Sequence, residues 1–166
     1  AVVAAARGAQ VLLAGYKDGP RLALARALGI TACADLYETV LDSAVAAHFG
    51  DAPDIVLEAT GRPASVLEGL RVLRSEGVLG VVGIHAEPLV LALNLLVRGK
   101  KQLRGCHDST PGSFAEAITR LTEAPALYAQ MITHRLPLEQ AEDGFALARN
   151  GAELKVMLFP EGGLHD

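Results

Sequence analysis

The sequence has few aromatic and sulfur-containing residues. Of its 166 residues, 4% are aromatic, none is tryptophan, and the two cysteines are Cys33 and Cys106. The cysteines lie far apart and neither belongs to a CxxC or Cys/His pattern, so their spacing indicates neither a disulfide framework nor a local zinc site. We expect two reduced thiols, which are typical of a cytoplasmic protein.

Charge of one sign and long apolar runs are also missing. The net charge is -4, and acidic and basic residues are interspersed along the chain. This pattern argues against a nucleic-acid surface. Charged residues interrupt every apolar run before it reaches the roughly 18 to 20 residues that a membrane span needs. We therefore expect a soluble protein with neither nucleic acid nor a membrane among its partners.

Motifs for phosphate binding and catalysis are absent as well. The G-x-G-x-x-G motif does not occur, so either the chain is no dinucleotide site or the motif precedes Ala1. The chain opens on an apolar helical stretch without an initiator Met or an N-cap residue, which favours the second interpretation and predicts a fragment. The histidines lack metal-ligand spacing and no serine lies in a G-x-S-x-G elbow, so we predict no catalytic residue and no metal site.

Short apolar runs alternate with helical stretches almost throughout the chain. Hydrophobic residues make up 51% of the sequence, mostly Ala, Val, Leu and Ile, as suits a parallel sheet covered by helices. The expected strands are 11–15, 54–61, 78–84, 102–106 and 154–159, with a minor strand in 31–37. The expected helices are an opening one closed by Gly8, then 21–28, 39–49, 65–75, 111–122 and 139–149, while 89–97 is a helix or an extended arm.

This order predicts an α/β fold, with a doubly wound, mostly parallel sheet of Rossmann type that lacks the first strand and its Gly-rich loop. We expect a single domain over residues 1–166. The continuous apolar run at 78–84 predicts a fully buried central strand.

Glycine lies in the turn after each of four expected strands. Ligands of open parallel sheets bind beyond the carboxyl ends of the strands, and glycine lets the backbone bend or approach a flat ligand closely. The turns are Gly15–Asp18, Ala59–Arg62, Val82–Ile84 and Gly105–Asp108. Taken singly each turn is weak support, because glycine ends strands in every fold.

The most specific pattern lies near the end of the chain and reads ITHRLPLEQAEDGFALARNGAELKVML. Together with VLLAG, RLALARALG, DIVLEATG, VLGVVGI and KQLRG, it resembles the C-terminal half of the zinc-type medium-chain dehydrogenases, the family of alcohol, sorbitol and threonine dehydrogenases. The resemblance implies an NAD(P)-binding domain of an enzyme that transfers hydride between a small alcohol and NAD(P). It also implies that the zinc ligands lie mainly in an N-terminal half not contained here, so that this chain alone is inactive.

The same resemblance implies coenzyme contacts at particular positions. Gly15, Tyr16 and Arg21 would meet the adenosine ribose. Ala59, Thr60 and Gly61 would line the adenine side. Val82, Gly83 and Ile84 would line the nicotinamide. Cys106 and His107 would lie near the carboxamide, and Lys155 would contact the pyrophosphate.

The preference between NAD and NADP stays open from the sequence. Family members that prefer NAD usually carry an acidic residue where this chain has Gly15. Lys17 and Arg21 could bind a 2'-phosphate, whereas Asp18 could hold ribose hydroxyls. By the same resemblance, residues 89–97 and 102–106 would pair with a second subunit, which implies a homodimer or tetramer.

A second class of function fits the same fold. A non-catalytic, Rossmann-like nucleotide-sensing regulatory domain would bind a ligand and signal to a partner. The stretch that precedes Ala1 would discriminate the two, because an upstream Cys/His/Glu-bearing domain and G-x-G-x-x-G motif belong to the enzyme. A methyltransferase-like domain is disfavoured, since it would carry an acidic residue in place of Gly15.

Overall fold

The computed structural model describes residues 1–151 and 153–160. The chain divides into two compact units. The terminal unit consists of residues 1–37 and the described residues from Thr110 onward, and the central unit consists of residues 38–109. Every strand pair among the described residues is parallel, and the pairings form three sheets. The parallel α/β class predicted from the sequence is therefore confirmed.

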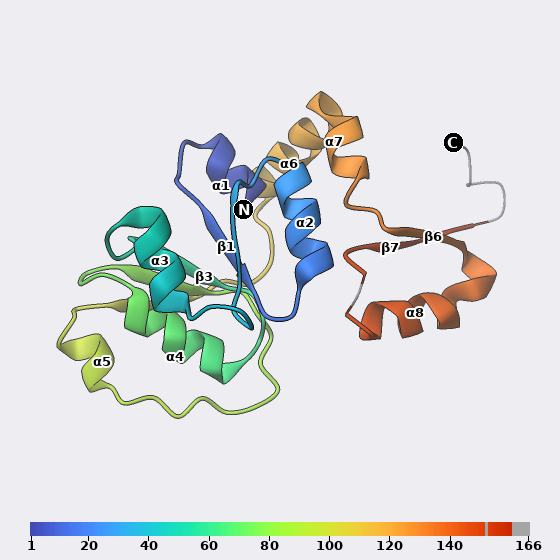
Figure 1. Cartoon of the computed structure of the whole chain (residues 1–166). Coiled ribbons are helices and arrows are strands. Elements are labelled where there is room, and N and C mark those ends of the chain that lie inside the picture. The colour runs from blue at the N-terminus through green and yellow to red at the C-terminus, as the bar shows by residue number, and fades with distance from the viewer. Residues whose placement is uncertain (152, 161–166) are drawn as a thin grey trace. The chain divides into compact units, whose positions relative to one another are not determined.

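Two parallel strand pairs build the terminal unit, and helical segments connect the strands of each pair (Figure 1). In the first pair, β1 (Leu12–Gly15) and β2 (Ala32–Asp35) are joined through α2 (Gly19–Ala27). In the second pair, β6 (His134–Pro137) and β7 (Val156–Phe159) are joined through η1 (Leu138–Gln140) and α8 (Ala141–Arg149). The other helices of this unit are α1 (Val2–Ala6), α6 (Pro111–Glu123) and α7 (Pro125–Ala129). The sequence pattern does not predict α7.

Helix α2 follows the predicted pattern closely. Pro20 lies in its first turn, where a missing N–H costs nothing. Leu22, Ala25 and Leu28 recur at helical spacing and are all buried, as predicted. Gly29 adopts φ +90° directly after the helix, a left-handed conformation that ends helices and that glycine adopts without steric cost. The apolar face of α2 thus covers the β1–β2 pair.

The central unit holds a three-stranded sheet in the order β3 (Ile55–Glu58), β4 (Val78–Val81) and β5 (Gln102–Gly105). Its helices are α3 (Leu41–Phe49), α4 (Pro63–Val72) and α5 (Asn94–Val97). The segment 89–97 combines both predicted alternatives, because an extended stretch precedes the short helix α5.

The core of the central unit lies between α4 and β4. Val66, Leu70 and Leu73, which share one helical face, pack with Leu79 of β4 in a buried cluster. Leu70 and Leu79 are both 0% exposed. Gly69 permits this close contact, because a Cβ atom there would lie 2.8 Å from Cδ1 of Leu79. The sheet is therefore fixed against α4 through β3 and β4, where Gly69 lies against Val56 and Leu79.

The predicted strand 78–84 is correct in position but too long. β4 is the central strand of its sheet, yet it ends at Val81, which pairs with Glu58 at the end of β3. Beyond that point the backbone N–H groups of Val82 and Gly83 both donate to the carbonyl of Glu58, at 2.7 and 3.1 Å. The chain therefore turns, and the last apolar residue of the run, Ile84, is 81% exposed.

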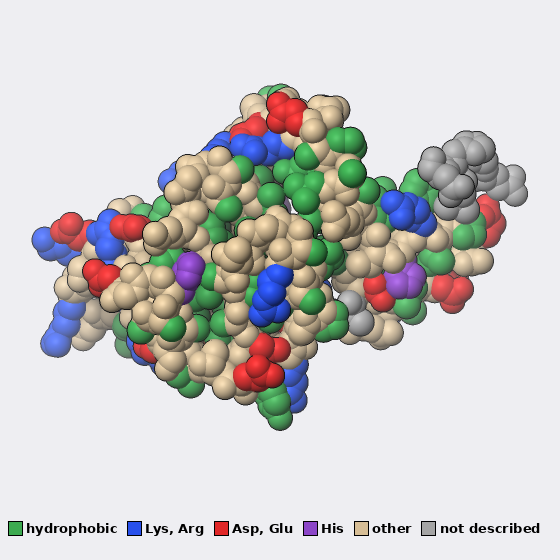
Figure 2. All heavy atoms as spheres, turned by 45° about the horizontal axis from the view of Figure 1, so that its top comes forward, with side chains coloured by type: hydrophobic (Ala, Val, Ile, Leu, Met, Phe, Trp, Pro, Cys, Tyr) green, Lys and Arg blue, Asp and Glu red, His purple; other side chains and the backbone are tan. Residues whose placement is uncertain are grey.

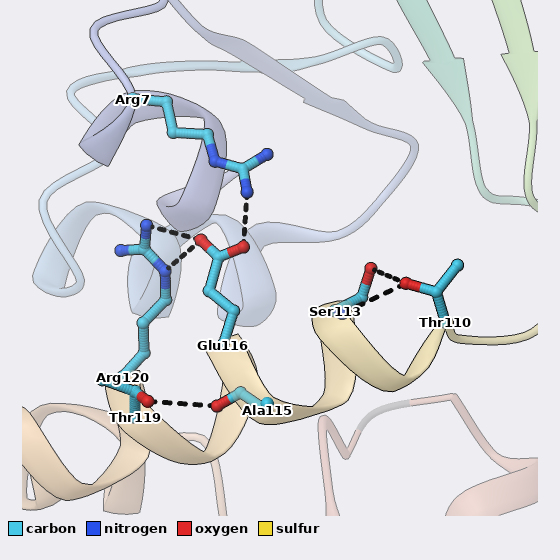
Figure 3. Close-up of polar contacts among 7 residues, drawn as sticks. All are labelled: Arg7, Thr110, Ser113, Ala115, Glu116, Thr119 and Arg120. Atoms are coloured by element: carbon cyan, nitrogen blue, oxygen red, sulfur yellow. Dashed lines mark hydrogen bonds and ion pairs between the residues drawn. The ribbon is translucent and has the colours of Figure 1, made fainter.

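Helix α6 begins and is anchored through side-chain contacts (Figure 3). Oγ1 of Thr110 accepts the backbone N–H of Ser113 at 3.1 Å, which caps the helix. Further along α6, Glu116 lies between two guanidinium groups, Arg7 at the end of α1 and Arg120 one turn later. Hydrogen bonds from Arg120, together with the charge of Arg7, hold the pKa of the Glu116 carboxyl below its ordinary value.

Charges of both signs are spread over the surface. On the face drawn in Figure 2, basic and acidic side chains lie near one another, and hydrophobic side chains reach the surface between them. None of the helices in the described ranges has the length and apolar character needed to cross a membrane.

Candidate functional site

The turn after β1 is held in place by a carboxylate from the neighbouring strand. Asp35, the last residue of β2, accepts the backbone N–H groups of Lys17 at 2.8 Å, Asp18 at 3.1 Å and Tyr37 at 3.0 Å. The hydrogen bond from Tyr37 contributes most to holding the pKa of Asp35 below its ordinary value, against a smaller opposing effect of desolvation. Lys17 adopts φ +52°, and Asp35 stabilises this unusual conformation.

Gly15 is needed at the start of this turn. A Cβ atom at position 15 would lie 2.9 Å from Cβ of Asp18, so any larger residue would displace Asp18. Asp18 in turn accepts a hydrogen bond from Nε of Arg21 at 2.6 Å. Because the carboxylate folds back over Gly15 and pairs with Arg21, the turn presents no free acidic group at the end of β1.

Aromatic and cationic side chains gather at this turn, where Tyr37 comes from the segment after β2. The rings of Tyr16 and Tyr37 meet edge to face with centroids 6.0 Å apart, and Nζ of Lys17 lies 4.5 Å from the centroid of Tyr37. Both tyrosines are exposed. The turn thus offers flat apolar surfaces beside two cations, Lys17 and Arg21, a combination suited to a nucleoside with an attached phosphate.

The turn after β3 is organised by a buried carboxylate. Glu58 is 3% exposed, and its Oε1 accepts the backbone N–H of Thr60 at 2.6 Å, the hydroxyl of Thr60 at 2.6 Å and the backbone N–H of Gly61 at 2.9 Å. Its other oxygen, Oε2, lies 3.0 Å from Nε2 of His85. Burial raises the pKa of Glu58, but the hydrogen bonds from Thr60, His85 and Gly61 outweigh it, so the pKa lies below its ordinary value.

The turns after β3 and β4 approach one another through two glycines. A Cβ atom on Gly61, which has φ +72°, would lie 2.4 Å from the carbonyl oxygen of Ile84. A Cβ atom on Gly83 would lie 2.3 Å from the backbone nitrogen of Gly61. Both distances are far below contact separation, so only glycine fits at either position. The structure thus brings together the predicted groups Ala59–Gly61 and Val82–Ile84.

Cys106 and His107 follow β5, the third strand of the same sheet. The backbone N–H of Cys106 donates to the carbonyl of Val81 at 2.8 Å, which keeps Cys106 beside the end of β4. His107 is exposed, with Asp108 as a neighbour 3.6 Å away. Both predicted residues therefore lie at the same sheet edge as Val82 and Gly83.

Lys155 belongs to the terminal unit and directly precedes β7. Its carbonyl accepts hydrogen bonds from the backbone N–H of Thr133 at 2.9 Å and from the Thr133 hydroxyl at 3.1 Å. The Lys155 side chain is exposed. Its backbone is fixed while its ammonium group extends into solvent, and its predicted role stays a prediction.

Sequence reasoning missed Asp35, Glu58 and His85 as residues that shape these turns. A signal existed for Glu58, since it is the one acidic residue inside the apolar run IVLEAT, and a lone buried acid at a strand end needs local N–H donors. His85 carried no such signal, because its partner Glu58 is distant in the chain, and neither did the contacts of Asp35 with Lys17 and Asp18, which come from the preceding strand–turn segment.

The described residues offer no zinc site. No three His, Cys, Asp or Glu side chains in the described part of the chain lie close enough together to bind a metal ion. In the central unit, glycine turns lie beyond the ends of β3 and β4. In the terminal unit, exposed tyrosines and cations lie beyond the ends of β1 and β2.

Comparison with known proteins identifies the family. Residues 1–123 match the family model described as zinc-binding dehydrogenase. The chain belongs to this family, and it matches the C-terminal, coenzyme-binding half of the zinc-type medium-chain dehydrogenases. The predicted resemblance is therefore confirmed.

Individual relatives agree with this assignment. The chain is 30% identical to L-threonine 3-dehydrogenase of Bacillus subtilis (strain 168), with 95% of this chain and 46% of the relative covered. It is 31% identical to sorbitol dehydrogenase of Mus musculus, with 95% and 44% covered. The solved alcohol dehydrogenase of Thermotoga maritima superimposes with a TM-score of 0.79 at 30% identity over 90% of this chain and 42% of that one. The chain thus spans less than half the length of these relatives.

Proposed function

We propose that this chain is the coenzyme-binding portion of a zinc-dependent alcohol or polyol dehydrogenase, and that the intact enzyme transfers hydride between a small alcohol and NAD(P). One observation supports this proposal most directly. The turns after β3 and β4 meet through Gly61 and Gly83 and are hydrogen-bonded to Glu58, in a chain that belongs to the zinc-binding dehydrogenase family. In this proposal residues 1–166 act as one NAD(P)-binding domain.

The bound nicotinamide coenzyme supplies the hydride donor or acceptor. The chain's own residues bind and orient it. Val82 and Ile84, whose apolar side chains are exposed at the end of β4, would cover the nicotinamide ring with Gly83 between them. Cys106 and His107 would flank the carboxamide, Ala59, Thr60 and Gly61 would line the adenine side, and Lys155 would neutralise the pyrophosphate.

The turn after β1 supports NADP(H) as the preferred coenzyme. The acidic residue that hydrogen-bonds the ribose 2'-hydroxyl in NAD sites is replaced by Gly15. The carboxylate of Asp18 is paired with Arg21, and Lys17 lies close by over Tyr37. A 2'-phosphate would meet two cations in this turn, where the carboxylate of Asp18 is paired with Arg21 and that of Asp35 accepts backbone N–H groups.

Fluorescence titration with NADH and NADPH tests both parts of the proposal. We expect saturable binding, with NADPH bound more tightly by a factor of about ten, as one charge-assisted contact provides. Arg21→Ala should remove most of this difference in affinity, because it should weaken the binding of NADPH and leave the binding of NADH unchanged. The matched control is Arg26→Ala, since Arg26 lies on the same helix and donates to the carbonyl of Cys33. Tighter binding of NADH would contradict the preference, and binding of neither coenzyme would contradict the function.

Zinc and subunit contacts belong to the intact enzyme in this proposal. Zinc ligands would come from outside these residues, where the metal would polarise the alcohol oxygen. The edge strand β5 and the exposed Val90, Leu93 and Val97 support a homodimer or tetramer, which light scattering of the purified protein measures. Cys33 and Cys106 are free thiols, which supports a cytoplasmic location.

A further inference from the structure

His85 makes a side-chain contact between the two glycine turns of the central unit. Its side chain is 18% exposed, and its Nε2 atom lies 3.0 Å from Oε2 of Glu58, whose side chain is 1% exposed. Oε1 of Glu58 holds the turn after β3 through Thr60 and Gly61. One carboxylate therefore binds the turn after β3 with one oxygen and His85, from the turn after β4, with the other.

The proton in this contact can be assigned from its chemistry. Three N–H or O–H groups donate to Oε1 of Glu58, as an ionised carboxylate requires. An ionised carboxylate can only accept hydrogen bonds, so Nε2 of His85 carries the proton and donates it. Without the imidazole, Oε2 would remain buried without its donor, which is costly for a charged group.

The segment after β4 has few backbone hydrogen bonds, and its first packing against the core of the unit comes at Leu89 and Leu91. Backbone hydrogen bonds to Glu58 end at Gly83. In the described part of the chain, no backbone-to-backbone hydrogen bond involves residues 84–91. The contact of His85 with Glu58 thus fixes the segment just after Val82–Ile84, where sheet pairing no longer does so.

We propose that His85 is a positioning residue, which locks the turn after β4 onto Glu58 and so holds Val82, Gly83 and Ile84 in the conformation that receives the nicotinamide end of the coenzyme. This inference rests on the proposed coenzyme function. In this role the imidazole determines the conformation of the binding turn through Glu58 and does not itself contact the coenzyme.

The test compares His85→Ala with His85→Gln, whose amide Nε2 can occupy the place of the imidazole Nε2 and donate to Glu58. Amide hydrogen exchange without coenzyme and NADPH titration are measured on the same 166-residue protein. We expect His85→Ala to exchange faster at Val82 and Gly83 and to bind NADPH about tenfold more weakly, the loss expected for one hydrogen bond to a charged group. His85→Gln should restore both properties, and the exchange of β1 should not change.

His48→Ala is the matched control, because His48 is an exposed imidazole of the same unit whose ring meets that of Phe49 edge to face. If His85→Ala does not fold, His85→Asn replaces it, since its shorter amide ends at the position of Nδ1 and does not reach Glu58. Unchanged exchange and unchanged NADPH affinity in the non-donating variant would overturn the inference. If the wild type binds neither coenzyme, the proposed function fails, and the exchange comparison alone then decides whether His85 locks the turn.

Discussion

At the scale of single residues, Asp35 and Glu58 have the same role. Each is an acidic residue at the carboxyl end of a strand, and each accepts backbone N–H groups of a turn that the sequence assigns to coenzyme binding. These donors hold the pKa of both carboxyls below their ordinary values. The charged form of each residue therefore stabilises the conformation of its turn.

The lowered pKa of Glu58 predicts how stability depends on pH. The stabilisation is complete above the ordinary glutamate pKa of about 4.3 and is lost as the pH falls through the lower pKa of the folded state. Glu58→Gln cannot titrate, so its free energy of unfolding should fall less steeply than that of the wild type below about pH 4.3. At neutral pH the variant should be less stable by about 1–3 kcal/mol.

Urea denaturation at a series of pH values measures both effects. Glu38→Gln serves as the control, since it makes the same chemical change at an exposed glutamate of the same unit. Equal slopes for the wild type and Glu58→Gln in the acidic range would show that the buried carboxylate does not stabilise the folded state through its charge.

At the scale of helices and strands, the contact of α4 with β4 determines how firmly the turns are supported. Leu70 is 0% exposed and lies in the cluster with Leu79. Leu70→Ala leaves a cavity there and should lower the free energy of unfolding by about 2–5 kcal/mol. Ile55→Ala changes a side chain that is 63% exposed and should lower the free energy of unfolding far less. Chemical denaturation of both variants makes the comparison, and equal losses would contradict the assigned core.

The start of α6 allows a second test at this scale. Thr110→Ala removes the cap that Figure 3 shows and should cost about 0.5–2 kcal/mol of stability. Thr119→Ala removes the same hydroxyl within the same helix, where it donates to the carbonyl of Ala115, and should be neutral or slightly stabilising. Thermal unfolding distinguishes them, and the cap assignment fails if the two variants unfold alike.

Helices and strands could be predicted from the sequence where the spacing of nearby residues determines them. The apolar spacing of Leu22, Ala25 and Leu28 and the Gly29 stop define α2 without any tertiary information. The end of β4 was not predictable, because it depends on where its partner β3 ends and on two N–H groups that share the carbonyl of Glu58. The short helix α7 has too few residues to show a period.

The candidate site was predictable only in part for a similar reason. Glycines after strands are visible in the sequence, so Gly61 and Gly83 could be named as site residues. Asp35 acts across the sheet on Lys17 and Asp18, and His85 reaches Glu58 over 27 residues of chain. Such pairings depend on strand register, which no local pattern specifies.

At the scale of the whole molecule, the chain spans less than half the length of its relatives. If the alcohol and the zinc are held by residues outside it, the 166-residue protein should bind coenzyme but not reduce NADP⁺ with sorbitol, threonine or simple alcohols. The absorbance of the reduced nicotinamide measures the formation of NADPH directly. Turnover by this chain alone would contradict the division of tasks, and the full-length sorbitol dehydrogenase of Mus musculus provides the positive control.

The ion pairs of Glu116 with Arg7 and Arg120 also bear on how the protein folds during synthesis. Arg7 is separated from Glu116 by 109 positions, and the ribosome needs on the order of ten seconds to produce such a stretch. During that time α1 lacks the carboxylate that anchors it, and residues 38–109 of the central unit are synthesised. Helix α1 is therefore anchored late, because its contact with Glu116 forms only after the whole central unit has left the ribosome's active site.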